Sequence, residues 1–134
     1  MCSSDLLLNQ RYNKLPVNLE KYGDRWYEFT VWSNLYKVTE QGKTPGLVMT
    51  RTQAGECMEI LKEEIDSCRP SIIIMEIDSS WFTTFSTLFS SIEVHSDPVV
   101  KITARRGDSL VLVTSRPEVI SKELFCTSVL EYID

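Results

Sequence analysis

The stretch CRPSIIIMEIDSS (Cys68–Ser80) decides the predicted fold class, because it holds an apolar run between two segments of helical pattern. Between Ser71 and Glu76 the run has no polar residue, which is typical of a strand buried on both faces. The segment before it, roughly residues 51–67, carries apolar residues at helical spacing, and Thr50 and Gln53 fit a capping box at its start. A helix followed at once by such a strand implies a parallel sheet, so the sequence predicts an α/β protein.

The remaining segments continue the alternation of strands and helices. The predicted order β-α-β-α-β-β-α indicates a three-layer α/β/α sandwich with a mainly parallel sheet. The two last strands either pair directly as a hairpin across the turn RRGDS or sit as neighbours in the sheet. The predicted elements are a strand at 27–32, a helix after DSS with an apolar stripe from Trp81 to Ile92, strands at Val99–Ala104 and Leu110–Val113, and a C-terminal helix opening at Pro117.

The length and charge of the chain limit its class. With 134 residues it fits one domain, 1–134, in which residues 1–23 read as an arm or irregular segment. The net charge of −5 argues against a broad electrostatic footprint for nucleic-acid phosphates, although a local basic patch stays open. No signal peptide or transmembrane segment is indicated, so a soluble cytoplasmic protein is expected.

The cysteine and histidine content predicts no metal site and no cofactor. The four cysteines contain no C-x-x-C pair and only His95, read as a loop histidine, could join them. Cys57 and Cys68 lie about three helical turns apart and are expected to be small core residues on one helix face. The acidic residues of the same helix are expected to be a solvated face; they are Glu56, Glu59, Glu63, Glu64 and Asp66.

Two predicted strand exits carry a family resemblance. They are WSNLYK (Trp32–Lys37) and VTSRPE (Val113–Glu118), and generic enzyme motifs are absent elsewhere. At these exits, and in the helix between them, the sequence resembles the uracil-DNA glycosylase-like superfamily over residues 24–131. The matching segments are DRWYEFTVWSNLYKVT (Asp24–Thr39), the helix and strand from Gln53 to Met75, Trp81 at the opening of the next helix, and LVTSRPE (Leu112–Glu118).

The resemblance implies a site and a partner. The usual activity of that family is hydrolysis of the N-glycosidic bond of uracil in DNA. The base is flipped from the stack, and its anion is stabilised by the histidine of a His-Pro motif. Asn34 corresponds to a polar residue at the base-binding edge, and Arg116 stands where the family places that histidine. The resemblance therefore gives Asn34 and Arg116 as catalytic candidates, Ser33, Asn34, Ser115 and Arg116 as ligand-binding candidates, and uracil-containing DNA as the partner.

Two departures point away from catalysis. The family's first strand and its Gly-rich turn have no counterpart in residues 1–23, so the chain is expected to match the later part of the domain. Whether that motif is lost, is supplied by another chain or lies upstream is open. Arg116 is longer than histidine and always charged, and it could grip a phosphate or base anion or simply close a surface loop. Asn34 could likewise bond local backbone.

The sequence therefore predicts a uracil-DNA glycosylase-like domain that lacks glycosidase activity by itself. The alternative is a small acidic protein-interaction module, a subunit or an inhibitor, which keeps the fold without nucleic-acid chemistry. The net negative charge of the chain and the acidic face of the helix at 51–67 favour this alternative. A partner protein or a homodimer is expected in that case, with no membrane and no metal involved.

Overall fold

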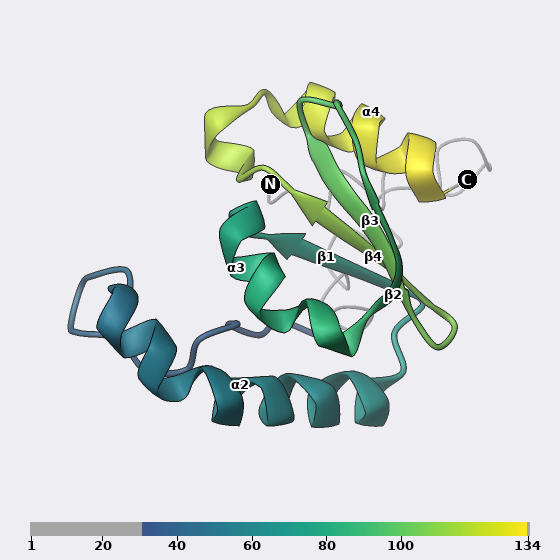
Figure 1. Ribbon diagram of the computed structural model, residues 1–134. Helices are drawn as coiled ribbons and strands as arrows, with labels where there is room; N and C mark the ends of the chain where they lie inside the picture. Colours follow the sequence, from purple (N-terminus) through teal and green to yellow (C-terminus); the bar gives the residue numbers. More distant parts are fainter. Residues whose placement is uncertain (1–30, 134) are drawn as a thin grey trace, which may run out of the picture.

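The computed structural model of the chain describes residues 31–133. Over that range four strands form one sheet in the order β1-β4-β3-β2, and helices pack on both of its faces (Figure 1). The prediction of an α/β protein is confirmed. The elements are α2 (Leu47–Cys68), β1 (Ile72–Glu76), α3 (Ser79–Phe85), the 3₁₀ helix η3 (Ser86–Leu88), β2 (Ser90–Val94), β3 (Val100–Arg106), β4 (Ser109–Thr114), the 3₁₀ helix η4 (Pro117–Val119) and α4 (Lys122–Ile133).

The predicted helix before β1 is present as α2, but it begins differently. Its N-cap is Gly46, and no side chain caps the first turn. The predicted capping box is wrong, because Thr50 lies inside the helix and Gln53 bonds outside it. The Gln53 Oε1 accepts the backbone N–H groups of Lys37 and Val38 at 3.1 and 3.0 Å, which leaves it no role at the helix start.

The C-terminal end of α2 shows that the prediction of Cys68 as a core residue is wrong. Arg69 adopts a φ of 46° and Pro70 follows, so the helix stops at Cys68. Cys57 is buried as predicted, whereas Cys68 is exposed. The reason is position along the axis, since Ile65 is the last buried residue of α2 and Cys68 lies beyond it.

The sheet has one parallel pair and two antiparallel pairs. β1 and β4 run parallel, β4 pairs antiparallel with β3, and β3 pairs antiparallel with β2. The prediction of a mainly parallel sheet is therefore wrong. Only Gly107 and Asp108 separate β3 from β4, and a two-residue turn joins antiparallel neighbours. Gly107, with a φ of 55°, supplies the backbone conformation that such a turn needs.

The predicted helix after DSS is only partly present. α3 ends at Phe85, and the chain passes through η3 into β2 where the helical pattern had continued to Ile92. Side-chain hydroxyls compete for the carbonyl groups of the helix: the Thr83 Oγ1 donates to Ser79 O at 3.1 Å, and the Ser86 Oγ donates to Thr83 O at 2.7 Å. Together with poor helix formers, these bonds explain the early end.

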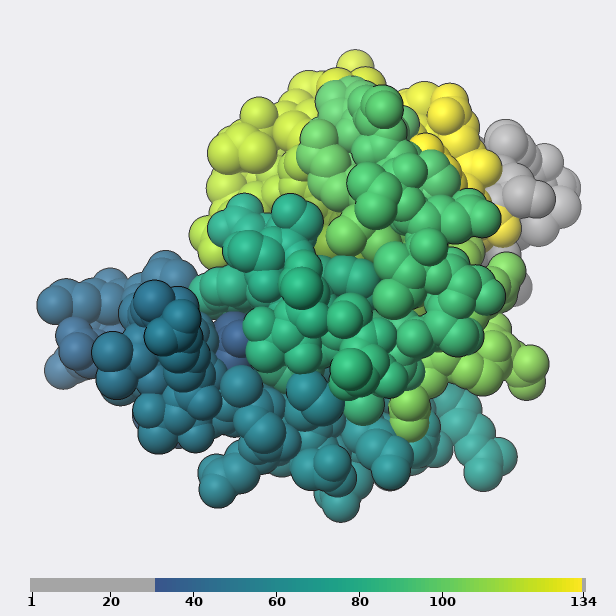
Figure 2. Space-filling view, in the orientation of Figure 1, coloured from purple at the N-terminus to yellow at the C-terminus, as the bar shows by residue number. Residues whose placement is uncertain are grey.

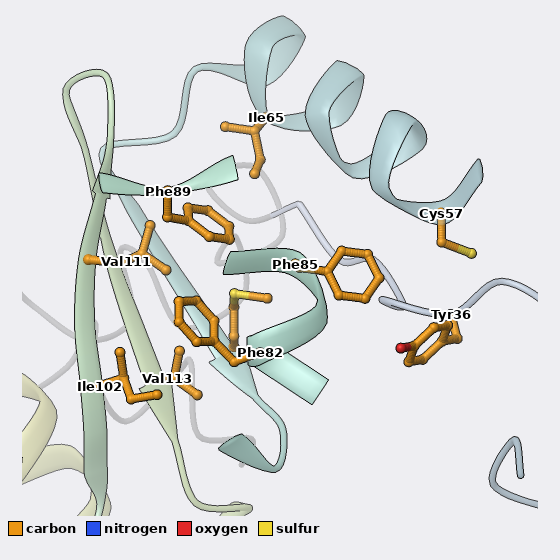
Figure 3. Close-up of a cluster of buried hydrophobic side chains, with 11 residues drawn as sticks. Tyr36, Cys57, Ile65, Phe82, Phe85, Phe89, Ile102, Val111 and Val113 are labelled. Atoms are coloured by element: carbon orange, nitrogen blue, oxygen red, sulfur yellow. The ribbon is translucent and has the colours of Figure 1, made fainter. Parts of the chain in front are cut away.

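Phenylalanines fill the space between the sheet and α2 (Figure 3). Phe82 and Phe85 come from α3, and Phe89 lies just before β2, with its ring stacked on Phe82 at a centroid distance of 5.5 Å. Cys57 and Ile65 of α2 close the cluster from the helix side. Phe89 thus reaches the core from the residue just before β2. Its sequence spacing from Phe82 and Phe85 also fits a helix, which is why the apolar pattern predicted a helix where β2 lies.

α4 covers the opposite face of the sheet. Phe125, Cys126 and Val129 of α4 are fully buried with Leu112 of β4 and Val100 of β3. Burying a large apolar side chain stabilises the fold by about 1.5–3 kcal/mol, so this second cluster holds α4 firmly against the sheet.

The predicted C-terminal helix is split in two. Pro117 opens η4, the backbone is extended at Ile120, and α4 starts afresh after Ser121. The Ser121 Oγ accepts the backbone N–H of Leu124 at 3.2 Å, as a helix-capping hydroxyl does.

Two predictions concern residues outside the described range. The predicted arm at 1–23 and most of the predicted strand at 27–32 lie there; Val31 and Trp32, at its end, are not part of a strand. Figure 2 shows that the N-terminal part of α2 and the loop before it project from the rest of the surface. None of the helices in residues 31–133 is long and apolar enough to cross a membrane.

Candidate functional site

The carboxyl ends of β1 and β4 meet at one corner of the sheet, where α/β proteins commonly bind ligands. Glu76 and Thr114, the last residues of the two strands, lie opposite each other in the parallel register. The pair two residues earlier, Ile74 and Leu112, packs beneath α4. Because side chains alternate along a strand, Glu76 and Thr114 lie on that same face of the sheet, one step beyond the core.

Thr114 is fully buried, and its Oγ1 has no hydrogen-bond partner among residues 31–133. On the β3 side its neighbour in register is the apolar Val100, so Glu76 is the polar side chain beside it along this row. A buried polar group without a partner costs about 1–3 kcal/mol. The buried hydroxyl therefore lowers the stability of the fold, which makes it a candidate for contact with a ligand.

Glu76 has a perturbed acidity. Burial, together with the negative charge of Glu118 in η4, raises the pKa of the Glu76 carboxyl group above its ordinary value. Within residues 31–133 neither carboxylate makes a hydrogen bond or an ion pair. The corner thus gathers two carboxylates and one hydroxyl whose hydrogen-bonding capacity is unused.

Ser115 and Arg116, two of the predicted site residues, follow directly after β4. Ser115 closes the corner, since its N–H donates to Val99 O at 2.9 Å and its Oγ donates to Pro98 O at 3.0 Å. The Arg116 side chain is exposed and makes no hydrogen bond or ion pair with any described residue. Its backbone carbonyl accepts the N–H of Val119, so the backbone of Arg116 closes the loop and leaves its guanidinium available at the surface.

Ser33 and Asn34, the other two predicted site residues, are tied to α2. The Ser33 Oγ donates to the Glu64 carboxylate at 2.8 Å, and the Lys37 Nζ bridges the Ser33 Oγ, the Asn34 carbonyl oxygen and Glu64. The Asn34 side chain is exposed and has no such bond to the described part of the chain. These contacts hold residues 33–37 against the helix, which is a structural role.

The four predicted site residues thus belong to two different places. Ser33 and Asn34 are bonded to α2, whereas Ser115 and Arg116 lie between β4 and η4, and no hydrogen bond or ion pair within residues 31–133 joins the two pairs. Within the described residues, the contacts of Ser33 and of Ser115 therefore give the two pairs separate local surroundings.

β2 is the outermost strand of the described sheet, opposite the β1 edge (Figure 1). Val94 lies opposite Ile102 of β3, and the next residue, His95, donates its N–H to Lys101 O at 2.8 Å. In an antiparallel ladder, hydrogen-bonded pairs alternate with pairs that share no hydrogen bond. Val94 therefore directs its own N–H and C=O away from β3, toward the outer edge of the sheet.

The side chains of β2 are all exposed, including two apolar ones. The exposed fraction is 80% for Val94 and 43% for Ile92. Val94 continues the apolar face on which Ile102 is buried, beyond the part that α2 and α3 cover. Glu93 lies on the other face, opposite Thr103, and its carboxylate makes no ion pair within the described range. Glu93 and the irregular register between Ser90 and Glu93 are features that protect edge strands, so the exposed apolar side chains of β2 are confined to Ile92 and Val94.

Other reactive groups have structural roles. His95 Nε2 lies 2.8 Å from the Thr103 Oγ1, and its ring packs on Tyr132, so it is held in place just after β2. Burial raises the pKa of the Cys126 thiol to about 11, which keeps it protonated at neutral pH. No group of three or more His, Cys, Asp or Glu side chains is placed to share a metal ion in the described chain.

Sequence reasoning missed the corner residues and the outer strand. Glu76 did carry a signal, because it is the first charged residue after an otherwise apolar run. Thr114 gave no signal, since threonine is common in strands. Only the strand register shows that Val100 and Glu76 lie beside its unpartnered Oγ1 in the described chain.

Comparisons with protein-family models, with curated proteins and with solved structures find no match to this chain.

Proposed function

We propose that this chain is a protein-interaction module that binds an extended segment of a partner protein along β2 and has no glycosidase activity by itself. The observation that carries the proposal is an outer strand with exposed Ile92 and Val94 and with the backbone groups of Val94 directed away from β3. An extended segment can join such an edge, where main-chain hydrogen bonds give affinity and alternate side chains give specificity.

The chemistry of β2 defines the partner segment. On the face shared with α3, apolar residues of the partner would cover Ile92 and Val94 and remove them from water. On the other face, Glu93 favours a lysine or arginine directly opposite, a pairing that contributes about 0.2–1 kcal/mol. The net charge of −5 also attracts a basic segment at long range. The partner is therefore a segment in which apolar and basic residues alternate.

A pair of short peptides tests this proposal. A peptide of alternating valine and lysine should bind the full chain and shift the NMR signals of residues 90–94, whereas one of alternating valine and glutamate should bind at least about tenfold more weakly. Val94→Pro removes the outward N–H without breaking a bond to β3, so it should abolish binding and keep the fold.

Three outcomes would refute the proposed use of β2. The first is equal binding of both peptides, and the second is unchanged binding by the Val94→Pro variant. The third is peptide-induced shifts at Leu47 and Val48, the exposed apolar residues of the projecting end of α2. Concentration-dependent dimerisation through β2 that excludes the peptide would assign the edge to a second copy instead.

A second candidate is a uracil-DNA glycosylase-like relationship of fold without the activity. One observation favours it: the loop of Ser115, Arg116 and Pro117 leaves the carboxyl end of a strand that has a parallel neighbour, with helices on both faces of the sheet. In this proposal the exposed Arg116 contacts a phosphate or a base anion where the family places a histidine.

Uracil-containing oligonucleotides separate the two candidates. We expect no alkali-labile sites after incubation of the full chain with single- or double-stranded substrate. Turnover that is lost in Asn34→Ala or Arg116→Ala would contradict the inactive assignment. Tight binding that weakens steeply with salt and depends on Arg116 would favour the second candidate over the first.

A further inference from the structure

The corner at the carboxyl ends of β1 and β4 presents oxygen donors from three elements. Glu76 ends β1, Thr114 ends β4, and Glu118 lies in η4, where its charge is, after burial, the second cause that raises the pKa of Glu76. Glu76 and Thr114 share one face of the sheet through their parallel register. The pairing of β1 with β4 brings Glu76 beside Thr114, which is far from it in the sequence, and Glu118 follows Thr114 by four residues.

Two independent observations show that these donors are unsatisfied. The Thr114 Oγ1 is buried without a hydrogen-bond partner in the described part of the chain. The Glu76 and Glu118 carboxylates repel each other and have no neutralising ion pair within residues 31–133, in contrast to Glu64 and Asp66, which pair with Lys37 and Arg106. A positively charged group that accepts oxygen ligands would remove both deficits at once.

We propose that Glu76, Thr114 and Glu118 form a binding site for a hard divalent cation of the Mg²⁺ type. All the donors are oxygens, and carboxylates with a hydroxyl are ligands that Mg²⁺ and Mn²⁺ accept, whereas Zn²⁺ favours the nitrogen and sulfur ligands that the corner lacks. Mg²⁺ commonly binds through one or two carboxylates and keeps several waters, so three protein donors suffice.

The site is distinct from the acidic face of α2. Glu59 and Glu63 also lie near each other, one helical turn apart, but they are exposed and have no buried hydroxyl beside them. Exposed carboxylates of this kind attract cations only diffusely. They supply a matched control for the proposal, because removing them changes the charge of the chain without touching the corner.

Paramagnetic broadening by Mn²⁺ tests the site in the full chain. Mn²⁺ alone should broaden the amide NMR signals at the ends of β1 and β4 in a saturable way, and Mg²⁺ should reverse the effect by competition. Glu76→Gln should weaken the apparent affinity by about tenfold or more, and Thr114→Val should weaken it by several-fold. The double variant Glu59→Gln, Glu63→Gln should leave it unchanged.

Specific results would overturn the proposal. Broadening centred on α2 and abolished by the Glu59→Gln, Glu63→Gln variant would assign the effect to the helix surface. Non-saturable broadening, or the same affinity in Glu76→Gln as in the unaltered chain, would also refute the site. Thermal denaturation of each variant shows whether the fold is retained, and Glu118→Gln provides a second test at an exposed position that the core does not require.

Discussion

The two ends of the sheet depart from ordinary burial in opposite ways. At the β1 end, where the carboxyl ends of β1 and β4 meet, the Thr114 hydroxyl is buried and the Glu76 carboxylate is partly buried, and neither has a hydrogen-bond partner within residues 31–133. At the β2 end, the apolar side chains of Ile92 and Val94 face water. Between the two ends, the central residues of β4 and β3 are covered by helices on both faces, and their buried side chains are apolar.

This contrast indicates that the two ends are suited to different partners. Unpaired buried oxygens favour a small charged ligand, because desolvated donors gain most from a cation. Exposed apolar residues with outward backbone groups favour another polypeptide chain, because only an added strand satisfies both. The shared core positions both ends, and the following changes separate their contributions.

The largest expected effect comes from removing the core that supports both ends. Phe85 is fully buried and packs edge-on against Tyr36 at a centroid distance of 5.4 Å. Phe85→Ala should lower the free energy of unfolding by about 3–5 kcal/mol, as measured by chemical denaturation. A loss below about 1 kcal/mol would mean that α3 does not support the sheet as described.

Proline substitutions at adjacent positions of the outer strand should differ strongly. His95→Pro removes the N–H that bonds Lys101 O and should cost about 2 kcal/mol, whereas Val94→Pro should cost less than about 1 kcal/mol. His95→Ala serves as the control for the loss of the ring contact with Tyr132. Equal destabilisation by the two prolines would show that Val94 does not face outward.

The buried hydroxyl gives a smaller effect of opposite sign. Thr114→Val keeps the shape of the side chain and removes the unpartnered Oγ1, so metal-free protein should gain about 1 kcal/mol of stability in chemical denaturation. A loss of stability would indicate that the hydroxyl already has a partner in solution.

The smallest effect concerns the pH dependence of stability. Burial and Glu118 raise the pKa of Glu76 in the folded chain, so its contribution to stability is present at acidic pH and is lost as the pH rises through that raised pKa. Glu76→Gln should therefore stabilise the chain at neutral pH, by an amount that disappears in acid. Denaturation midpoints across this range measure it, and a variant that is less stable at neutral pH would contradict the assigned environment.

The sequence predicted regular elements well where one local pattern dominated. The helix α2 and the strand β1 followed from spacing and an apolar run, and the β3–β4 hairpin was one of the two arrangements that the glycine-containing turn left open. β2 was missed, because Phe89 reaches the core at a spacing that also fits a helix. The number of parallel strand pairs was overestimated, since strand direction in a sheet is determined by which strands pair in space.

The candidate site was predicted less completely than the fold. Ser115 and Arg116 follow the end of a strand as predicted, because the carboxyl end of a strand is visible in the sequence, and their role in a site stays a prediction. Glu76 and Thr114 become a pair only through the register of β1 and β4, which local patterns do not specify. The outward direction of Val94 likewise depends on the hydrogen-bond phase of β2 with β3.

The most direct test of the proposed function is the amide of Val94 during titration with the valine–lysine peptide. If the peptide adds as a strand, the Val94 N–H should become protected from hydrogen exchange and shift downfield, while the N–H of His95, already bonded to Lys101, should change little. A Val94 amide that stays unprotected when the peptide is fully bound would contradict strand addition at β2.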